Sequence, residues 1–212
     1  MHPRSITVDL LSDTTFYQGG GTPGVVDIEI QHDELGLPYL SGKTVRGLIL
    51  DSWLSLCGYF PELEQAAKRI FGSPGEMFPT SILRIGDAVV ASNVREWVTW
   101  AERREHNPIT PEDVLSALTD VRFQISQDRD TGVPKKGTLR ATRVIIRGVR
   151  LESPLIWLEE PTQDELRCLA LGVLACRHAG LGSNRGRGWV SLSLNGDIEW
   201  TRQCARGGWL TP

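Results

Sequence analysis

The chain has 212 residues, of which 40% are hydrophobic and 23% are charged, and its formal net charge is −3. This is an ordinary composition for one globular domain, and no apolar run approaches the ~18 residues of a membrane span. The first residues carry charges too early and too often for a signal peptide, so we expect a cytoplasmic protein.

The first third of the chain predicts a strand, a loop and two helices. Residues 5–13 are rich in β-branched and apolar side chains, as strands are. The glycine-rich loop QGGGTPG, 18–24, leads into the extended segment VVDIEI, 25–30. An apolar stripe at helical spacing predicts a helix over 41–57, and a second one follows over 63–72.

The tripeptide GKT at the start of the first helix is not the phosphate-binding loop of an NTPase. That loop requires a glycine five positions before its GKT, where this chain has Leu37. Nevertheless, free N–H groups at a helix N-terminus favour an anion, and Lys43 and Arg46 lie in that part of the helix. The alternatives are a phosphate contact and two solvated surface cations. The candidate RNA-binding residues here are Ser41, Gly42, Lys43 and Arg46.

The middle of the chain predicts more strands and a polar insertion. TSILRIGDAVV, 80–90, reads as a strand, and residues 92–119 read as an insertion with two helical pieces. Further strands are predicted at 121–126, 138–147 and 149–158.

Positive charge is concentrated in the second half. Residues 1–120 carry 9 Lys/Arg and 17 Asp/Glu, whereas residues 121–212 carry 14 and 9. The segment KKGTLRATRVIIRGVR, 135–150, has six cations and no acid. Such a concentration is either a nucleic-acid-binding patch or a solvated strand face. The candidate RNA-binding residues in it are Lys135, Lys136 and Arg140.

The C-terminal part predicts a helix and a strand. Thr162 and Glu165 form a capping box, and Gly180 is the expected end of the helix. WVSLSL, 189–194, follows as a strand. The order strand, helix, strands, helix, strand predicts an α+β fold. We expect a ferredoxin-like sandwich, the shape of RNA-recognition domains, as one domain over 1–212 with insertions.

The loop HAGLGSNRGRGWV, 178–190, is the most specific local stretch. It is not a dinucleotide fingerprint, because Arg185 stands where the third glycine of that motif is required and no strand precedes the loop. Its glycines allow close backbone approach, and its arginines suit phosphate, so we favour a phosphate-backbone contact over an ordinary turn. The candidate residues are Gly182, Ser183, Asn184, Arg185, Gly186, Arg187 and Gly188.

The four cysteines and the acidic turn after residue 127 point to no metal site. The cysteines form no C-x-x-C pair, so buried free thiols are the expected state, ahead of disulfides or a zinc site. Asp128, Asp130 and Gly132 do not make a calcium loop, because the glycine comes one position early and Leu139 replaces the required glutamate.

Three ordered segments together resemble the RAMP superfamily of CRISPR proteins, and most of all the backbone (Cas7-like) subunits of type III effector complexes. GLPYLSGKTVRGLI, 36–49, is similar to the family's Leu-Pro-Tyr-Ile-Pro-Gly-Ser-Ser-Leu-Lys-Gly stretch. QDRDTGVPKKGTLRATRVIIRG, 127–148, is similar to its Asp-x-x-Thr-Gly-x-Ala-x-x-Gly-x-Leu segment. GLGSNRGRGWV, 180–190, is similar to its glycine-rich loop. The set spans most of the chain.

The resemblance implies a guide-RNA-binding subunit that cleaves complementary target RNA. The family's catalytic aspartate follows the N-terminal glycine-rich loop, which points to Asp27, although Ile28 and Glu29 replace the usual Asn-Pro or Ser-Pro. It also implies a divalent metal at Asp27, Mg²⁺ or Mn²⁺, and a thumb-like hairpin at about 127–137. The implied partners are crRNA, target RNA, other effector subunits and copies of this chain, without a membrane.

Two rival functions stay open. One is a catalytically silent RNA-binding scaffold. The other is a metal-independent repeat-processing endoribonuclease of the same superfamily, with His32 or His178 as general acid or base.

Overall fold

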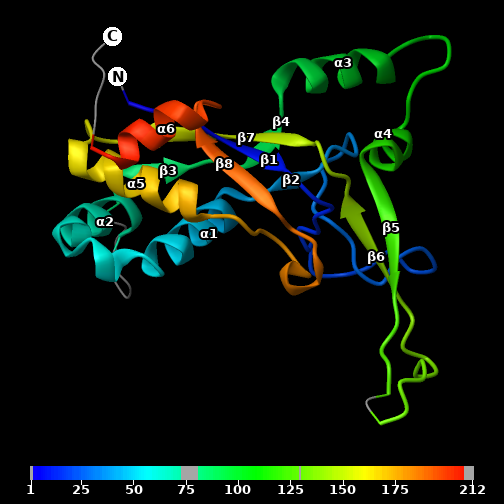
Figure 1. Ribbon diagram of the computed structural model, residues 1–212. Helices are drawn as coiled ribbons and strands as arrows, with labels where there is room; N and C mark the ends of the chain where they lie inside the picture. Colours follow the sequence, from blue (N-terminus) through cyan, green and yellow to red (C-terminus); the bar gives the residue numbers. More distant parts are fainter. Residues whose placement is uncertain (1, 73–80, 129, 208–212) are drawn as a thin grey trace.

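The computed structural model describes residues 2–72, 81–128 and 130–207, and its centre is an antiparallel sheet (Figure 1). The strands follow the order β2-β4-β7-β1-β8, and β3 also pairs with β7. The six strands are β1 (Ser5–Leu10), β2 (Tyr39–Leu40), β3 (Leu83–Ile85), β4 (Ala88–Val90), β7 (Arg150–Trp157) and β8 (Val190–Leu194).

Helices cover the buried side of this sheet. Side chains of β7 alternate between exposed and buried, so one face of the strand points into the core. The helices that pack together there are α1 (Gly42–Leu54), α2 (Glu64–Phe71), α5 (Gln163–Ala175) and α6 (Ile198–Ala205). Close packing of α1 and α5 requires a glycine, because a Cβ on Gly172 would lie 2.9 Å from Ile49.

A second, two-stranded sheet lies apart from the first and is called the ribbon here. It consists of β5 (Thr119–Gln124) and β6 (Arg140–Ile145). The hairpin between these strands extends away from the body (Figure 1). At its base end, the ribbon is joined to the chain after β1, because Thr14 N donates to Ile145 O at 3.0 Å and Ile145 N donates to Thr14 O at 2.7 Å.

Residues 92–119 contain two helices, α3 (Ser92–Glu102) and α4 (Pro111–Leu118), and lead directly into β5. The start of α4 is a capping box, since the Thr110 side chain accepts from Asp113 N and the Asp113 side chain accepts from Thr110 N. The same arrangement of Thr162 and Glu165 starts α5, as its sequence predicts.

Several element boundaries differ from those expected from the sequence. The expected strand at 80–90 is two short strands, β3 and β4, because the chain turns at Gly86, which donates to Pro154 O at 2.8 Å; residue 80 lies outside the described residues. The helix expected to end at Gly180 ends at Ala175, where Cys176 takes an extended conformation. The helix α6 was missed altogether.

Candidate RNA interface and catalytic carboxylate

Asp27 is an exposed residue held against the first residues of β6. Its backbone N donates to Ala141 O at 2.9 Å, and its Oδ2 accepts from Ala141 N at 2.7 Å. The next residue, Ile28, forms a parallel bridge with Thr142. The other carboxylate oxygen, Oδ1, has no hydrogen-bond partner in the described parts of the chain. Asp27 is therefore fixed by one oxygen and leaves the other for a ligand.

The second acid of this region, Asp33, is fully engaged. Its Oδ1 accepts from Leu35 N at 2.9 Å and from Leu37 N at 3.0 Å. Its Oδ2 forms an ion pair with Arg95 of α3. Asp33 organises a turn and ties it to α3, so Asp27 is the more available of the two carboxylates.

The glycine-rich loop 180–188 is anchored to the segment that follows β1. Leu181 N donates to Thr15 O at 3.0 Å, and Gly188 N donates to Asp13 O at 2.9 Å. A Cβ on Gly180 would lie 2.4 Å from Thr15 O, so only glycine allows this approach. Between the anchors, Gly182 and Gly186 adopt left-handed conformations with φ of 83° and 75° around a short 3-10 turn.

The loop and the ribbon enclose a cavity of about 290 Å³ next to the segment of Asp27. Arg185 reaches across and donates to Gln124 Oε1 at 3.1 Å. Gln124 pairs with Arg140 in the ribbon, which places these two side chains on one face. The residues that line the cavity are Thr15, Ile28, Gln124, Thr142, Leu181, Gly182, Ser183, Asn184, Arg185 and Arg187. The structure thus brings together the loop, the ribbon and the Asp27 segment, which the sequence analysis identified separately.

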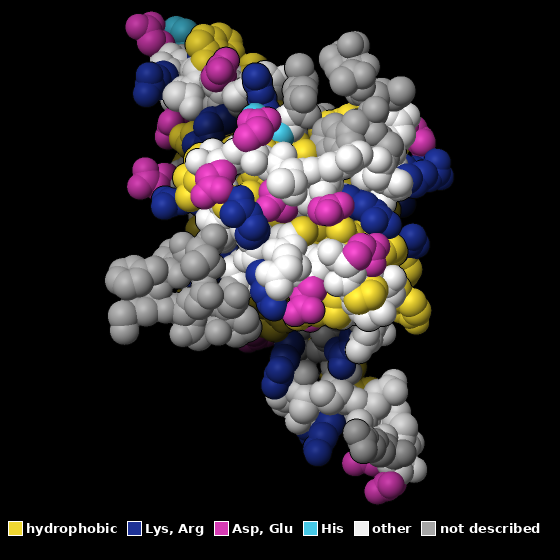
Figure 2. All heavy atoms as spheres, turned by 90° about the vertical axis from the view of Figure 1, so that its left-hand side faces the viewer, with side chains coloured by type: hydrophobic (Ala, Val, Ile, Leu, Met, Phe, Trp, Pro, Cys, Tyr) yellow, Lys and Arg dark blue, Asp and Glu magenta, His cyan; other side chains and the backbone are white. Residues whose placement is uncertain are grey.

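The hairpin extends this basic surface. Lys135, Lys136 and Arg140 are exposed. Figure 2 shows Lys and Arg side chains on the part of the hairpin nearer the body and acidic side chains near its tip. At the tip, backbone hydrogen bonds from Thr131 and Asp130 hold the pKa of Asp128 below its ordinary value. This carboxylate organises the turn, as Asp128 Oδ1 accepts from both N–H groups at 3.1 Å.

The N-terminus of α1 is partly satisfied by the protein itself. Gly42 N donates to Asp87 Oδ1 at 2.7 Å, which places a carboxylate where we expected a phosphate. Ser41 caps the helix by accepting from Thr44 N. The guanidinium of Arg46 donates to Phe71 O at the end of α2. An RNA contact at Lys43 and Arg46 stays a prediction.

Lys43 is the better placed of these two cations. Its side chain is exposed and forms no ion pair within the described residues. The sequence did not predict the contact between Gly42 and Asp87, because these residues lie 45 positions apart and form no local pattern.

Three of the four cysteines are buried, as expected, whereas Cys57 is only partly buried. Cys168, Cys176 and Cys204 are buried free thiols, and burial raises the pKa of Cys168 to about 12. His178 packs on Trp189 with ring centroids 4.3 Å apart. His32 Nδ1 lies 3.1 Å from Asp33 O.

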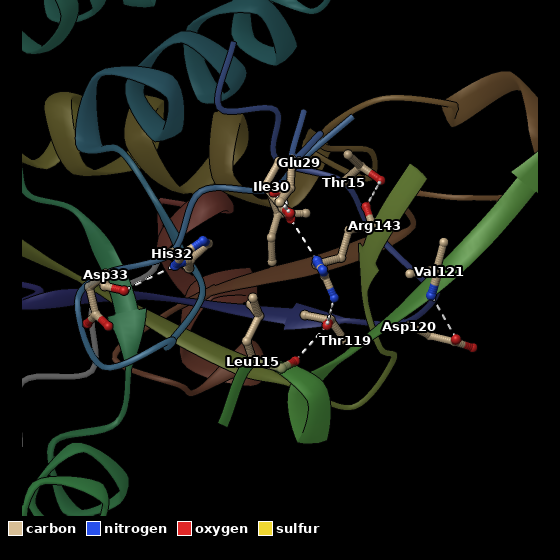
Figure 3. A network of polar contacts seen from close by, with 11 residues as sticks. Thr15, Glu29, Ile30, His32, Asp33, Leu115, Thr119, Asp120, Val121 and Arg143 are labelled. Carbon is tan, nitrogen blue, oxygen red and sulfur yellow. Dashed lines mark hydrogen bonds and ion pairs between the residues drawn. The ribbon is translucent and has the colours of Figure 1, made fainter. Parts of the chain in front are cut away.

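The segment that carries Asp27 is joined to the ribbon by a buried polar network that the sequence did not predict (Figure 3). Glu29 and Arg143 form an ion pair with Nε and Oε1 2.7 Å apart. Thr15 Oγ1 donates to Arg143 O at 3.0 Å, which links the network to the anchor of the glycine-rich loop. The sequence shows only an acid in an extended segment and an arginine in a predicted strand. These two features do not identify an ion pair between residues 114 positions apart.

Comparison with known proteins identifies the family. Residues 7–191 match the family model of the RAMP superfamily. The chain belongs to the RAMP superfamily. The membership expected from the three sequence segments is thereby confirmed. None of the curated proteins compared with this RAMP chain matches it.

Solved structures share the fold of this RAMP protein. A chain from the cryo-EM structure of type III-B Cmr-beta bound to cognate target RNA superposes with a TM-score of 0.67 at 14% identity, covering 95% of this chain and 99% of that one. A chain from type III-B Cmr-beta in the apo state gives 0.67 at 14%, covering 93% and 98%. The shared fold mixes helices with antiparallel strands. No helix within the described residues is long and apolar enough to span a membrane.

Proposed function

We propose that this RAMP protein is a guide-RNA-binding backbone subunit of a type III CRISPR effector complex and cleaves complementary target RNA. The observation that carries this is the position of Asp27, an exposed residue that the β6 backbone holds by Oδ2 and that directly precedes Ile28 in the lining of the cavity between the loop and the ribbon. The full-length likeness to chains of Cmr-beta supports the assignment to such a complex. Its partners would be crRNA, target RNA, other subunits and further copies of this chain, in the cytoplasm.

The proposed core is ferredoxin-like. Strands β4, β7, β1 and β8 lie side by side in that order. In chain order, the helix α1 lies between β1 and β4, and the helix α5 lies between β7 and β8. This split β-α-β arrangement supports the proposal.

In the proposed interface, some residues bind the guide RNA and others expose the target for cleavage. The main-chain N–H groups of the loop and the side chains of Arg185 and Arg187 would hold phosphates of the guide. Lys43 would add a further phosphate contact from α1. The hairpin, which stands clear of the body, would splay the guide–target duplex and expose the bond to be cut.

The residues present fit a divalent ion that keeps most of its own waters. Within the described residues, no group of three or more His, Cys, Asp or Glu side chains could hold a metal. Mg²⁺ commonly binds through one or two carboxylates and substrate phosphates, which Asp27 Oδ1 and RNA would supply. When bound, such an ion neutralises charge on the phosphate and the leaving oxygen.

The proposed reaction is transesterification. The 2′-oxygen of the target attacks the adjacent phosphorus and loses its proton, and the 5′-oxygen leaves and gains one. The products are a 2′,3′-cyclic phosphate and a 5′-hydroxyl. Asp27 would orient the reacting phosphate from a fixed position, because its Oδ2 is bound to the β6 backbone.

Substitution of Asp27 tests this function. Asp27→Ala is expected to abolish cutting of guide-complementary RNA, a loss of several orders of magnitude, while assembly and target binding stay near wild type. Wild-type cutting should stop with chelator and return with Mg²⁺ or Mn²⁺. Asp33→Ala is the comparison variant. Unlike Asp27→Ala, it should lower the thermal stability, because Asp33 accepts hydrogen bonds from Leu35 N and Leu37 N in the turn.

Other outcomes point to the rivals. If wild type never cuts assembled target with metal present, the protein is a silent scaffold. Cutting that survives chelator and fails in His32→Ala would identify a repeat-processing nuclease.

A further inference from the structure

The ion pair of Glu29 and Arg143 (Figure 3) lies close in the chain to the proposed catalytic carboxylate and its backbone partner. Glu29 follows Asp27 by two residues, and Arg143 follows Ala141, the partner of Asp27, by two residues. The side chains of the pair are only 8% and 14% exposed. A pair this well buried persists only where hydrogen bonds compensate the loss of water.

The compensation is extensive. Glu29 Oε1 also accepts from Ile30 N at 3.0 Å, and Oε2 accepts from the Thr22 hydroxyl at 2.9 Å. Arg143 also donates from Nη1 to Thr119 Oγ1 at 3.3 Å. The pair therefore connects the N-terminal glycine-rich loop, the extended segment and both strands of the ribbon.

The backbone contacts between the Asp27 segment and β6 are few. Asp27 N donates to Ala141 O at 2.9 Å, and Arg143 N donates to Ile28 O at 2.9 Å, around one parallel bridge. A ladder this short specifies its register weakly, since strand register is normally set by a longer pattern of buried side chains. The buried pair also defines the register, because a slip of the segment along β6 would separate Glu29 from Arg143.

We propose that Glu29 and Arg143 are positioning residues that fix the register of the Asp27 segment on β6. As a consequence, the position of the carboxylate depends on its register with β6 of the ribbon. This inference rests on the proposed function of Asp27. Neither side chain touches RNA, and each acts through the Asp27 backbone.

Activity of the guide-loaded complex provides the first test. Arg143→Met and Glu29→Gln should each lower kcat for target cleavage by ~10–100-fold with little change in target affinity, because a misplacement of ~1 Å can cost ~10²-fold. The double variant Glu29→Gln/Arg143→Met removes the unpaired buried charge and should regain stability, but not cutting. Full recovery of kcat in the double variant would show that the pair serves stability alone and would overturn the proposal.

A matched control comes from the same ribbon. Arg122 forms an ion pair with Asp13 at 2.8 Å and makes no hydrogen bond to the Asp27 segment within the described residues. Arg122→Met should keep wild-type kcat. An equal loss of kcat in Arg122→Met would show a general effect of ribbon charge and would overturn the assignment to the buried pair.

Amide hydrogen exchange tests the inference without cleavage. The N–H groups of Asp27, Ile28 and Ala141 should exchange at least ~10-fold faster in the double variant than in wild type, while those of β1 stay unchanged. Unchanged exchange at these three amides would overturn the proposal. A wild type that does not cut removes the proposed function, but the exchange result still decides the positioning role.

Discussion

Two glycines of the loop 180–188 have the same backbone conformation for different reasons. Gly180 and Gly186 have φ of 81° and 75°. A Cβ on Gly180 would lie 2.4 Å from Thr15 O, whereas a Cβ on Gly186 would meet nothing within 4 Å. Gly180 thus serves the packing of the loop on the body, and the space beside Gly186 is open for an external partner.

Gly186→Val is therefore expected to weaken guide RNA binding more than folding. The left-handed conformation costs a side-chain-bearing residue about 1–2 kcal/mol, and the valine methyl groups would occupy the open side of the loop. Binding isotherms and thermal unfolding of the variant measure the two effects. Gly180→Ala is the control, since it should lower the melting temperature more. Normal RNA affinity with only a lower melting temperature in Gly186→Val would mean that the loop is a structural turn.

At the scale of elements, the start of α1 is the clearest candidate for a sequence-independent phosphate contact. Lys43→Ala should weaken guide binding and reduce the magnitude of the log–log salt slope by ~0.7, the value for one contact to a single strand. Arg46→Ala should have a smaller effect on the slope and a larger one on stability, because Arg46 donates to Phe71 O. Titrations at several salt concentrations measure the slope. An unchanged slope in the Lys43→Ala/Arg46→Ala variant would remove the phosphate site.

Sequence patterns were informative about elements where the signal is local. The capping box of Thr162 and Glu165 predicted the start of α5, because both partners lie within one turn. Glycine misled at the end of α5, since Gly180 is needed for the approach to Thr15 and not as a helix cap. The helix α6 was not predicted, although Asp197 caps it by accepting from Trp200 N, because a short helix after the last strand carries only this one local signal.

At the scale of the molecule, the hairpin lies outside the hydrophobic core. Within the described residues, the core cluster draws no side chain from positions 119–144. Replacing residues 127–137 with an Asn-Gly turn between Ser126 and Thr138 should therefore lower the melting temperature by less than ~4 °C, about 1 kcal/mol for a chain of this size.

The shortened chain should also lose most target cutting, at least ~10-fold, if the hairpin exposes the scissile bond. Cleavage assays of the assembled complex measure this loss. Lys135→Ala/Lys136→Ala in the full-length hairpin is the control, because it removes charge and keeps shape. Wild-type cutting by the shortened chain would exclude a role for the hairpin in cleavage.

The candidate site was predictable only in part. Glycines, basic residues and an acid in the right order pointed to the segments that meet around the cavity. The distances could not be read from the sequence, because the site depends on long-range pairs. Asp27 with Ala141 and Arg185 with Gln124 are separated by 114 and 61 positions. The resemblance pointed to Asp27 by its place after the glycine-rich loop, but that Asp33 is engaged by two backbone N–H groups and by Arg95 could not be read from the sequence.

The separation of the ribbon from the main sheet bears on how such a chain diverges. The ribbon strands pair with each other, and single bridges at Thr14 and Ile28 join them to the rest. Core positions tolerate drift as long as volume and apolar character are kept, and the fold is shared with Cmr-beta chains at 14% identity. Insertions or deletions in the hairpin leave that packing untouched. Evolution can therefore change the reach of the hairpin one residue at a time while the core drifts under its own constraints.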